Sequence, residues 1–385
     1  MFTYDKEIEL DRELISRLAN WHLGKKDYPF QLDAELHQRC NLKCTFCPRY
    51  PMHDKLNRTS PLREMTTEKW IDIVKQAGKM HVRIFNIEGA NEPTAVPSLL
   101  FPVMEVVKEV GMYGILTTNG TLWDEEKIKL IVEIEWDRIH FSIDSIYPEV
   151  HDMLRGVKGS WKKAIQAIKW LNKWKEKLES KRPMLNMNIC INKFNFRQLP
   201  EMVELAHKLK VDYIFTEPLM IFSEDGKKLK LNRQETNELQ RYVAKAKKLA
   251  EKYGIDNNFA TRDKNLEKDV VKSTGKMHGL LKREVEKYDK GVVASPCFKP
   301  FERIAIRHQG LTGPCGLVKH GENVKEKSLK EIWFGKYFEA YRKRMLNKNL
   351  FDHCKRCVPS DFTQRRRIRE DLIAYLKEWK NEENN

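Results

Sequence analysis

The sequence predicts an α/β fold, in which a partial (β/α)6 TIM-like barrel is followed by a small C-terminal α+β domain. The first observation is a series of short segments in which polar and apolar residues alternate, separated by longer segments with helical periodicity. Strands that alternate with helices are typical of a parallel sheet covered by helices. The second observation is that seven of the eight cysteines fall into two groups, one near the start of this pattern and one near the C-terminus.

The expected strands each carry one polar and one apolar face, because successive strand residues point to opposite sides of a sheet. The polar members are Asp33, Glu35 and His37 in the first strand, Arg138, His140, Ser142 and Asp144 in the fourth, and Asn186, Asn188, Cys190 and Asn192 in the fifth. Unpaired buried polar groups are costly, so these residues are expected to line a wet or ligand-filled lumen. Loops at the carboxyl ends of the strands should then carry the chemistry.

Helical periodicity places the covering helices between these strands. The expected helices span residues 66–78, 98–111, 124–134, 160–178 and 197–209. The predicted organisation is a lead-in with a short helix over 1–30, the barrel over 31–221, a bridging segment over 222–290 with a helix near 234–254, and the C-terminal domain over 291–385, which ends in a helix over about 363–380.

Composition limits the class of protein. Lys and Arg number 71 against 55 Asp and Glu, giving a net charge of +16, which favours anionic partners such as phosphorylated metabolites, nucleic acid or a membrane surface. The basic residues are spread along the chain, which is also typical of a Lys/Glu-rich hyperthermophile surface. The densest cluster is Arg365, Arg366, Arg367 and Arg369. No stretch approaches the roughly 18 apolar residues of a membrane span, and the N-terminus resembles neither a signal nor a transit peptide, so a cytoplasmic protein is expected.

The first cysteine group has the spacing C-x3-C-x2-C. Cys40, Cys44 and Cys47 lie in the segment CNLKCTFCPR, and no fourth cysteine follows within 140 residues. Structural zinc prefers four ligands, whereas three thiolates suit a 4Fe–4S cube whose fourth iron is left open. The alternative is a zinc loop completed by a distant histidine such as His37.

This motif resembles that of the radical S-adenosylmethionine (radical SAM) enzymes, and the resemblance covers about residues 31–220. In that family the open iron binds the amino and carboxylate groups of SAM. The reduced cluster cleaves SAM to methionine and a 5′-deoxyadenosyl radical, which abstracts a hydrogen atom from the substrate. By the same resemblance, Phe46, the aromatic residue before the last cysteine, packs near the adenine.

Three further segments resemble SAM-binding motifs of the family, in the family's order. NIEGANEP resembles its GGEP segment, so Gly89 and Ala90 would let the backbone approach SAM and Glu92 would receive the SAM amino group, although Asn91 departs from plain GGEP. The remaining matches place Asn119 in the turn after the third strand, Ser142 and Asp144 facing the ribose and methionyl part of SAM, and Arg155 as a guanidinium fork on the SAM carboxylate.

Two lumen residues are candidates for direct roles in catalysis. Cys190 alternates with asparagines on the lumen face, and it is either a small buried hydrophobe or a hydrogen-atom donor to a substrate radical. Glu217, at the end of the sixth strand, is either a structural hydrogen-bond acceptor or a group that binds substrate or accepts its proton.

The second cysteine group comprises Cys297, Cys315, Cys354 and Cys357. Four thiolates suit either structural zinc or a fully ligated 4Fe–4S cluster. The CFKPF opening, the strand–turn–strand RIAIRHQGLTGPCG and the helix before the final C-x2-C resemble the shortened SPASM or twitch domain of radical SAM enzymes. The resemblance implies one auxiliary 4Fe–4S cluster without an open iron, suited to electron transfer.

These features lead to one main expectation for the function. We expect a radical SAM oxidoreductase or epimerase acting on a small polar substrate, such as a sugar, an aminocyclitol or a phosphorylated metabolite, with ferredoxin or flavodoxin as electron donor. The first 30 residues are shorter than the peptide-recognition domain of many peptide-modifying relatives, which favours this hypothesis. The alternatives are a peptide- or protein-modifying (RiPP-type) maturase and an RNA-modifying enzyme; a non-catalytic iron–sulfur or zinc protein is disfavoured by the SAM-binding motifs.

Overall fold

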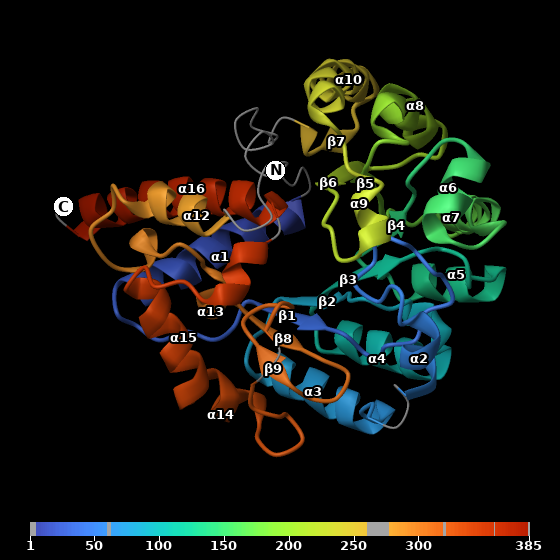
Figure 1. Cartoon of the computed structure of the whole chain (residues 1–385). Helices are drawn as coiled ribbons and strands as arrows, with labels where there is room; N and C mark the ends of the chain where they lie inside the picture. Colours follow the sequence, from blue (N-terminus) through green and yellow to red (C-terminus); the bar gives the residue numbers. More distant parts are fainter. Residues whose placement is uncertain (1–4, 60–62, 260–276, 319–320, 358, 384–385) are drawn as a thin grey trace.

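A single curved sheet organises the molecule (Figure 1), a computed structural model that describes residues 5–59, 63–259, 277–318, 321–357 and 359–383. Nine strands lie in the order β7-β6-β5-β4-β3-β2-β1-β8-β9, and all neighbours are parallel except β8 and β9. The strands are β1 (Gln31–Ala34), β2 (Ile84–Ile87), β3 (Tyr113–Thr118), β4 (Arg138–Ser142), β5 (Met184–Ile191), β6 (Tyr213–Pro218), β7 (Asp256–Asn257), β8 (Arg303–Ile306) and β9 (Thr312–Gly313).

Helices cover the outer face of β1 to β6, as Figure 1 shows, which confirms the predicted partial barrel. Each of the five helices expected within the barrel is present with its ends within two residues of the predicted bounds. The helices of the barrel and its bridge are α3 (Thr67–Lys79), α4 (Pro97–Glu109), α5 (Glu125–Glu133), α6 (Pro148–Arg155), α7 (Ser160–Lys177), α8 (Leu199–Lys208), α9 (Glu224–Lys227) and α10 (Arg233–Tyr253).

The apolar face of each strand packs against these helices. On β4, Ile139 and Phe141 are fully buried in the main apolar core, and on β5 Met187 and Ile189 join the same core. Gly114 on β3 leaves room for the ring of Trp136, because a Cβ at this position would lie 2.5 Å from that ring. The polar side chains of the same strands therefore face the opposite side, which is the predicted lumen.

The C-terminal cysteine region is joined to the barrel through the sheet. Residues 303–313 form the predicted strand–turn–strand, since β8 and β9 pair antiparallel. Beyond that expectation, β8 also pairs parallel with β1, with Gln31 opposite Arg303 and Ala34 opposite Ile306. An unpaired β1 edge would leave backbone groups without partners, and β8 satisfies them while it carries the second cysteine group to the barrel.

The first 30 residues contain more structure than the short helix expected there. Helix α1 (Asp5–His22) packs along α16 (Pro359–Glu383), and Leu18 and Leu372 are fully buried in the second apolar core. Glu7 pairs with Arg138 of β4 at 2.7 Å and fixes the start of α1 beneath the barrel. The predicted lead-in is thus packed against the C-terminal region. The amphipathic pattern of α1 indicates a buried face, but it does not indicate which element covers it.

The remaining helical elements follow β1, β2 and β5 or lie beyond residue 276. They are α2 (His53–Thr59), α12 (Met277–Val285), α13 (Lys299–Glu302), α14 (Leu329–Trp333) and α15 (Lys336–Leu346), with the 3₁₀ turns η2 (Pro93–Ala95), η3 (Phe196–Gln198), η5 (Val292–Ala294) and η6 (Asp352–Arg356). Within the described part of the chain, no helix is long and apolar enough to cross a membrane. Residues 260–276 of the predicted bridging segment lie outside the described residues.

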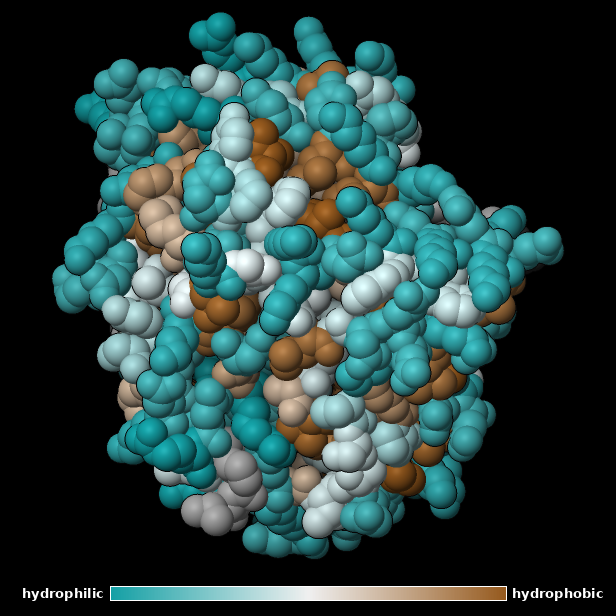
Figure 2. Space-filling view, turned by 90° about the vertical axis from the view of Figure 1, so that its right-hand side faces the viewer, coloured by the Kyte–Doolittle hydropathy of each residue, from teal (hydrophilic) through white to brown (hydrophobic). Residues whose placement is uncertain are grey.

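Hydrophilic side chains dominate the surface. Figure 2 shows the face on the right of Figure 1, where they cover most of the area and hydrophobic residues form smaller patches between them. This agrees with the 71 basic and 55 acidic residues spread along the sequence.

Candidate active site

The first three cysteines lie in an irregular loop between β1 and α2, held in place by Asn57. The Asn57 side chain accepts from the Cys40 backbone N at 3.1 Å and donates to the Cys40 carbonyl at 2.9 Å. The loop turns back on itself where the Cys47 N donates to the Cys44 carbonyl at 3.1 Å. Asn57 lies on α2, ten residues after Cys47, and its side chain fixes the backbone of Cys40.

Arg49 fastens the same loop to the neighbouring strand ends. Its guanidinium is buried, and it donates to Asn57 Oδ1 at 2.6 Å and to the Ala90 carbonyl at 3.3 Å. A further bond reaches the Gln38 carbonyl beyond β1. Arg49 therefore connects the cysteine loop, the end of β1 and the loop after β2. Sequence analysis missed both Arg49 and Asn57, because they bond to each other and to backbone groups, and no motif identifies such contacts.

The environment of these thiols suits a cluster with three thiolate ligands. Burial raises the pKa of Cys40 to about 11 and that of Cys44 to about 12, and the neighbouring thiols add to both shifts. The thiols are therefore close enough together to influence one another. The cations of Arg49 and Arg155 lie near them and favour their charged forms. A cluster bound here by three thiolates would carry negative charge. The cations of Arg49 and Arg155 would partly neutralise that charge.

The loop after β2 is built around Gly89 and Glu92. Gly89 has φ +148°, and a Cβ there would lie 2.9 Å from Cγ of Glu35. The buried Glu92 carboxylate accepts from Thr118 Oγ1 at 2.6 Å and from the Asn119 backbone N at 2.6 Å. Asn91, the residue that departs from GGEP, donates to the His37 carbonyl at 2.6 Å.

These hydrogen bonds hold the Glu92 side chain in place. Its carboxylate joins the loop after β2 to the end of β3, and it also accepts from the Thr94 backbone N at 3.2 Å. Burial raises the pKa of Glu92 and these hydrogen bonds lower it, with a net upward shift. The predicted contact of Glu92 with the SAM amino group stays a prediction, and its present partners favour a positioning role.

Asp144 and Arg155 form a buried pair beside the cysteine loop. Arg155 Nη2 lies 2.7 Å from Asp144 Oδ2, and the guanidinium covers the Phe46 ring at 5.3 Å from its centroid. Burial works to lower the pKa of Arg155, but the Asp144 carboxylate and the Cys44 thiol outweigh it and raise this pKa. Phe46, Asp144 and Arg155, three of the predicted SAM-binding residues, are therefore brought together.

The other predicted SAM residues lie at the adjacent strand ends. Asn119 donates to Asn41 Oδ1 at 3.0 Å, which connects the turn after β3 to the cysteine loop. Ser142 is the last residue of β4, and its side chain is half-buried on the lumen face. Their predicted contacts with SAM stay predictions.

The lumen carries both candidate catalytic residues. Cys190 and Glu217 are register partners on β5 and β6, and both are half-buried. The Cys190 backbone N donates to Asp144 Oδ1 at 2.9 Å, which places this residue next to the Asp144–Arg155 pair. The roles of Cys190 as hydrogen-atom donor and of Glu217 in substrate binding stay predictions.

Deeper in the lumen, three polar side chains carry buried atoms that lack a hydrogen-bond partner among the described residues. They are Asn186 Oδ1, Asn188 Oδ1 and His140 Nε2. Burial and the nearby Arg138 lower the pKa of His140 to about 3, so the ring is neutral. Buried polar atoms of this kind are normally satisfied by water or ligand, which fits the predicted wet or ligand-filled lumen.

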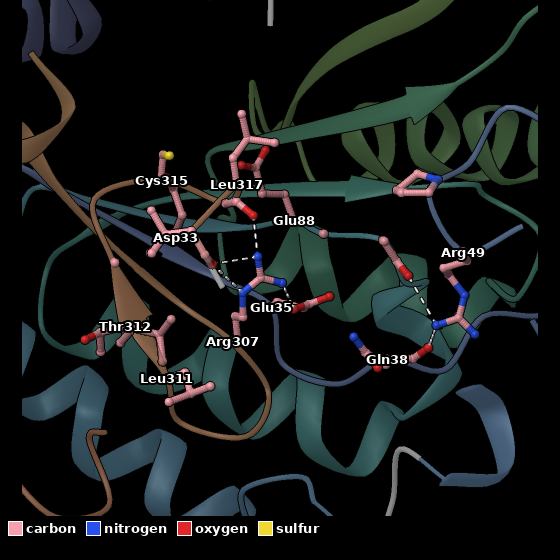
Figure 3. Close-up of a pocket in the computed structure, with 18 of the residues that line it drawn as sticks. Asp33, Glu35, Gln38, Arg49, Glu88, Arg307, Leu311, Thr312, Cys315 and Leu317 are labelled. Atoms are coloured by element: carbon pink, nitrogen blue, oxygen red, sulfur yellow. Dashed lines mark hydrogen bonds and ion pairs between the residues drawn. The ribbon is translucent and has the colours of Figure 1, made fainter. Parts of the chain in front are cut away.

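A cavity of about 360 Å³ lies between the first cysteine loop and the second cysteine group (Figure 3). Its walls come from β1, from the loop after β2, from the cysteine loop and from the segment that carries Cys315. Its lining residues include Asp33, Glu35, Glu88, Arg307, Cys315 and Leu317. Cys315 lines this cavity directly, so a molecule inside it would lie next to one thiol of the second group.

Arg307 connects the two sides of the cavity. Its Nε donates to the Val318 carbonyl at 3.1 Å, and its guanidinium also donates to the Gly316 carbonyl. Its Nη1 lies 3.7 Å from Glu35 Oε2. Figure 3 shows the two side chains pointing toward each other. Arg307 therefore fixes the backbone after Cys315 relative to β1. Sequence analysis missed it, because only the unexpected β1–β8 pairing brings these segments together.

Carboxylates give the cavity its charge. Asp33 pairs with Arg303 at 3.3 Å, and Glu35 faces Arg307. The Glu88 side chain lines the cavity and is exposed there. Burial and then the neighbouring Asp33 raise the pKa of Glu88. Glu88 is thus suited to exchange a proton near neutral pH.

The four C-terminal thiols converge from separate segments. Cys297, Cys354 and Cys357 pack against the second apolar core. Burial raises the pKa of Cys297 to about 11, with additions from Cys357 and Cys315, and raises that of Cys354 to about 12, with additions from the other three thiols. The donor set fits a four-thiolate group. Among the residues that the structure describes, no three Cys, His, Asp or Glu side chains are arranged to hold a single metal ion.

The arginine cluster of the last helix is engaged within the protein. Arg365 and Arg369 are buried, and the two outer residues form ion pairs, Arg366 with Glu284 at 3.1 Å and Arg367 with Asp11 at 2.9 Å. These contacts favour a structural role for the cluster, which weakens the main reason to consider RNA as a partner.

Comparison with protein families identifies both halves of this site. Residues 35–206 match the model of the radical SAM superfamily, and residues 297–358 match that of the SPASM iron-sulfur cluster-binding domain. These domains imply a SAM-binding 4Fe–4S cluster, an auxiliary cluster and SAM itself.

Curated relatives include a peptide-modifying enzyme. The PqqA peptide cyclase of Rhizobium meliloti (strain 1021) is 26% identical over 340 residues, which span 85% of this chain and 80% of that relative. The tungsten-containing aldehyde ferredoxin oxidoreductase cofactor-modifying protein of Pyrococcus furiosus is 29% identical over 196 residues, which span 49% of this chain and 51% of that relative.

Solved structures share the fold. The crystal structure of Streptococcus suis SuiB bound to its precursor peptide SuiA has a TM-score of 0.61 at 17% identity, covering 90% of this chain and 74% of that chain. Native anSMEcpe with bound AdoMet has a TM-score of 0.58 at 18% identity, covering 85% of this chain and 86% of that chain.

Proposed function

Because the chain belongs to the radical SAM superfamily and carries a C-terminal SPASM iron–sulfur domain, we propose that it oxidatively modifies a peptide or protein substrate in the cavity between its two cysteine sites. The sequence favoured a small polar substrate, with a peptide as the alternative. The match to a peptide cyclase over 85% of the chain supports the alternative. We therefore prefer a peptide.

The observation that carries this proposal is the position of the cavity. One wall is the loop after β2, with Gly89 and Ala90, beside the first cysteine loop. The opposite wall includes Cys315, a predicted ligand of the auxiliary cluster. A substrate group inside the cavity therefore lies between the SAM site and the auxiliary site.

The residues that would hold the two clusters lie on opposite sides of the cavity. Cys40, Cys44 and Cys47 would hold the SAM-binding cluster, and Cys297, Cys315, Cys354 and Cys357 the auxiliary one. When bound, these groups and SAM supply hydrogen-atom abstraction on one side of the cavity and electron removal on the other. The electron donor is proposed to be a ferredoxin or a flavodoxin.

The protein's own groups orient the substrate and handle its proton. A substrate that loses a hydrogen atom and an electron must also release a proton, and Glu88 faces the cavity with a raised pKa. Asp33 and Glu35 can accept hydrogen bonds from substrate N–H or O–H groups. We propose Glu88 as the proton acceptor and the other two acids as orienting residues.

The size of the cavity is compatible with a peptide side chain. Its volume of about 360 Å³ is near the lower end of the roughly 300–1,000 Å³ range of ligand pockets. A peptide would place one or two side chains inside, while its backbone remained outside the cavity.

The test uses 5′-deoxyadenosine formation by the reconstituted enzyme as its readout. An ultrafiltered extract of small peptides and metabolites from the native cells is added with SAM and dithionite, before or after digestion with a broad protease. We expect the extract to stimulate deoxyadenosine formation and digestion to abolish the stimulation. Stimulation that survives digestion would favour a small-molecule substrate and overturn the proposal. The Cys47→Ala variant gives the background.

A further inference from the structure

Helix α16 carries an arginine directly against the auxiliary thiols. Arg365 Nη2 lies 2.8 Å from Cys357 Sγ. The residue is only 5% exposed, although its charge is permanent at any physiological pH. Burying a guanidinium costs free energy unless it is paired. The contact with Cys357 Sγ therefore indicates that the positive charge acts on the thiol group.

We propose that Arg365 is a positioning residue that sets the reduction potential of the auxiliary cluster. Reduction adds negative charge to an iron–sulfur cluster, and hydrogen bonds to its sulfur ligands and its electrostatic surroundings tune its potential. A fixed positive charge at a ligand sulfur in a poorly solvated site stabilises the reduced form. Arg365 therefore raises the potential and makes the auxiliary cluster a better electron acceptor.

Arg369, one turn further along the same helix, contacts different groups. It donates to the Val293 carbonyl at 2.8 Å and to the Ser295 carbonyl at 3.1 Å, and its guanidinium covers the Phe298 ring at 4.8 Å. The two hydrogen bonds fix the backbone just before Cys297, and the ring contact lies just after it. The helix thus supplies one arginine to a ligand sulfur and one to the loop that carries another ligand.

The same helix also supplies the control. Arg366 follows Arg365 directly and pairs with Glu284 at its outer side. Substituting Arg366 removes one positive charge from α16, as a change at Arg365 does, but leaves the contact with Cys357 in place. Comparison of the two positions therefore separates a local effect on the cluster from a general effect of net charge.

The experiment is a redox titration of the auxiliary cluster alone. The full chain with Cys40, Cys44 and Cys47 replaced by alanine is reconstituted anaerobically, and the reduced cluster is followed by electron paramagnetic resonance. We expect Arg365→Gln to shift the midpoint potential to a more negative value, while Arg366→Gln leaves it at that of the parent. Arg365→Lys, which keeps the charge but not the guanidinium geometry, should lie between Arg365→Gln and the parent.

Two results would overturn the proposal. One is a midpoint potential in Arg365→Gln equal to that of the parent. If Arg365→Gln fails to bind iron, the same result in Arg365→Lys would overturn the proposal. The other is an equal shift in Arg366→Gln. No substrate enters this measurement, so its failure would leave the proposed peptide modification untouched, and a non-peptide substrate would leave this inference untouched.

Discussion

Arg155 Nη2 lies 2.7 Å from Asp144 Oδ2, so two residues expected to contact SAM are already each other's partners. Asp144 is fully buried, and its other oxygen accepts from the Cys190 backbone. The pair connects β4, α6 and β5 at the ends that face the cysteine loop. Asp144 therefore holds Arg155 and the Cys190 backbone in fixed positions relative to each other.

The first prediction concerns this pair. Asp144→Asn keeps an acceptor for the Cys190 backbone but leaves the Arg155 charge without its carboxylate. Removing one partner of a buried ion pair costs about 3–5 kcal/mol. We expect a comparable loss of unfolding free energy in denaturant titrations and weaker SAM binding. A double-mutant cycle with Arg155→Gln should show that the two changes are not additive; additive effects would contradict the coupling.

The second prediction concerns the cysteine loop. Asn57→Ala removes both hydrogen bonds to the Cys40 backbone, so the loop should no longer hold its thiols in place. Iron bound after reconstitution should fall from about eight per chain toward about four, because the auxiliary thiols are unaffected. Thr59→Ala, which removes a hydrogen bond to the Lys55 carbonyl within the same helix, serves as the control and should retain full iron.

The third prediction concerns Gly89. Gly89→Ala forces a side chain into positive φ and against Glu35, so it should destabilise the loop that approaches SAM. A strained residue costs about 1–3 kcal/mol, and SAM affinity should fall accordingly in a binding titration. Gly24 also has positive φ, but a Cβ there would meet nothing within 4 Å. Gly24→Ala should therefore leave SAM affinity unchanged, and an equal loss in both variants would rule out the proposed close approach.

The fourth prediction concerns the pH dependence of cluster assembly. Burial raises the pKa of Cys40 to about 11 and that of Cys44 to about 12, so both are protonated at neutral pH in the metal-free protein. Only thiolates bind iron, and binding must release these protons. Initial iron uptake should therefore rise between pH 7 and pH 9, by about tenfold per unit if one thiol is limiting. Stopped-flow absorbance would measure this rate, and a flat profile would be inconsistent with raised thiol pKa values.

Periodicity explains why the barrel could be predicted from the sequence. Strands such as Arg138–Ser142 are buried on one face and line the lumen on the other, so alternation is imposed on them. Helix ends were also predictable where caps are local, as at Asp124, whose side chain accepts from the Lys127 backbone at the start of α5. The cysteine spacing was informative because the ligands of one cluster lie in one short loop.

The remaining features depend on contacts between distant segments. The pairing of β8 with β1 joins residues about 270 positions apart, and no local pattern specifies it. Arg49, Asn57 and Arg307 act on backbone carbonyls and amides, which leave no signature in the sequence. Helix α1 was underestimated because its partner, α16, lies at the other end of the chain.

The central claim is that a peptide is oxidised between the two cysteine sites. The most direct measurement is mass spectrometry of the cell's small peptides after turnover with SAM and dithionite, comparing the intact enzyme with Cys315→Ala. We predict that the intact enzyme converts one peptide into a species lacking two hydrogen atoms, and that Cys315→Ala still forms deoxyadenosine without this product. Deoxyadenosine formation by the intact enzyme with no peptide changed in mass would contradict the account.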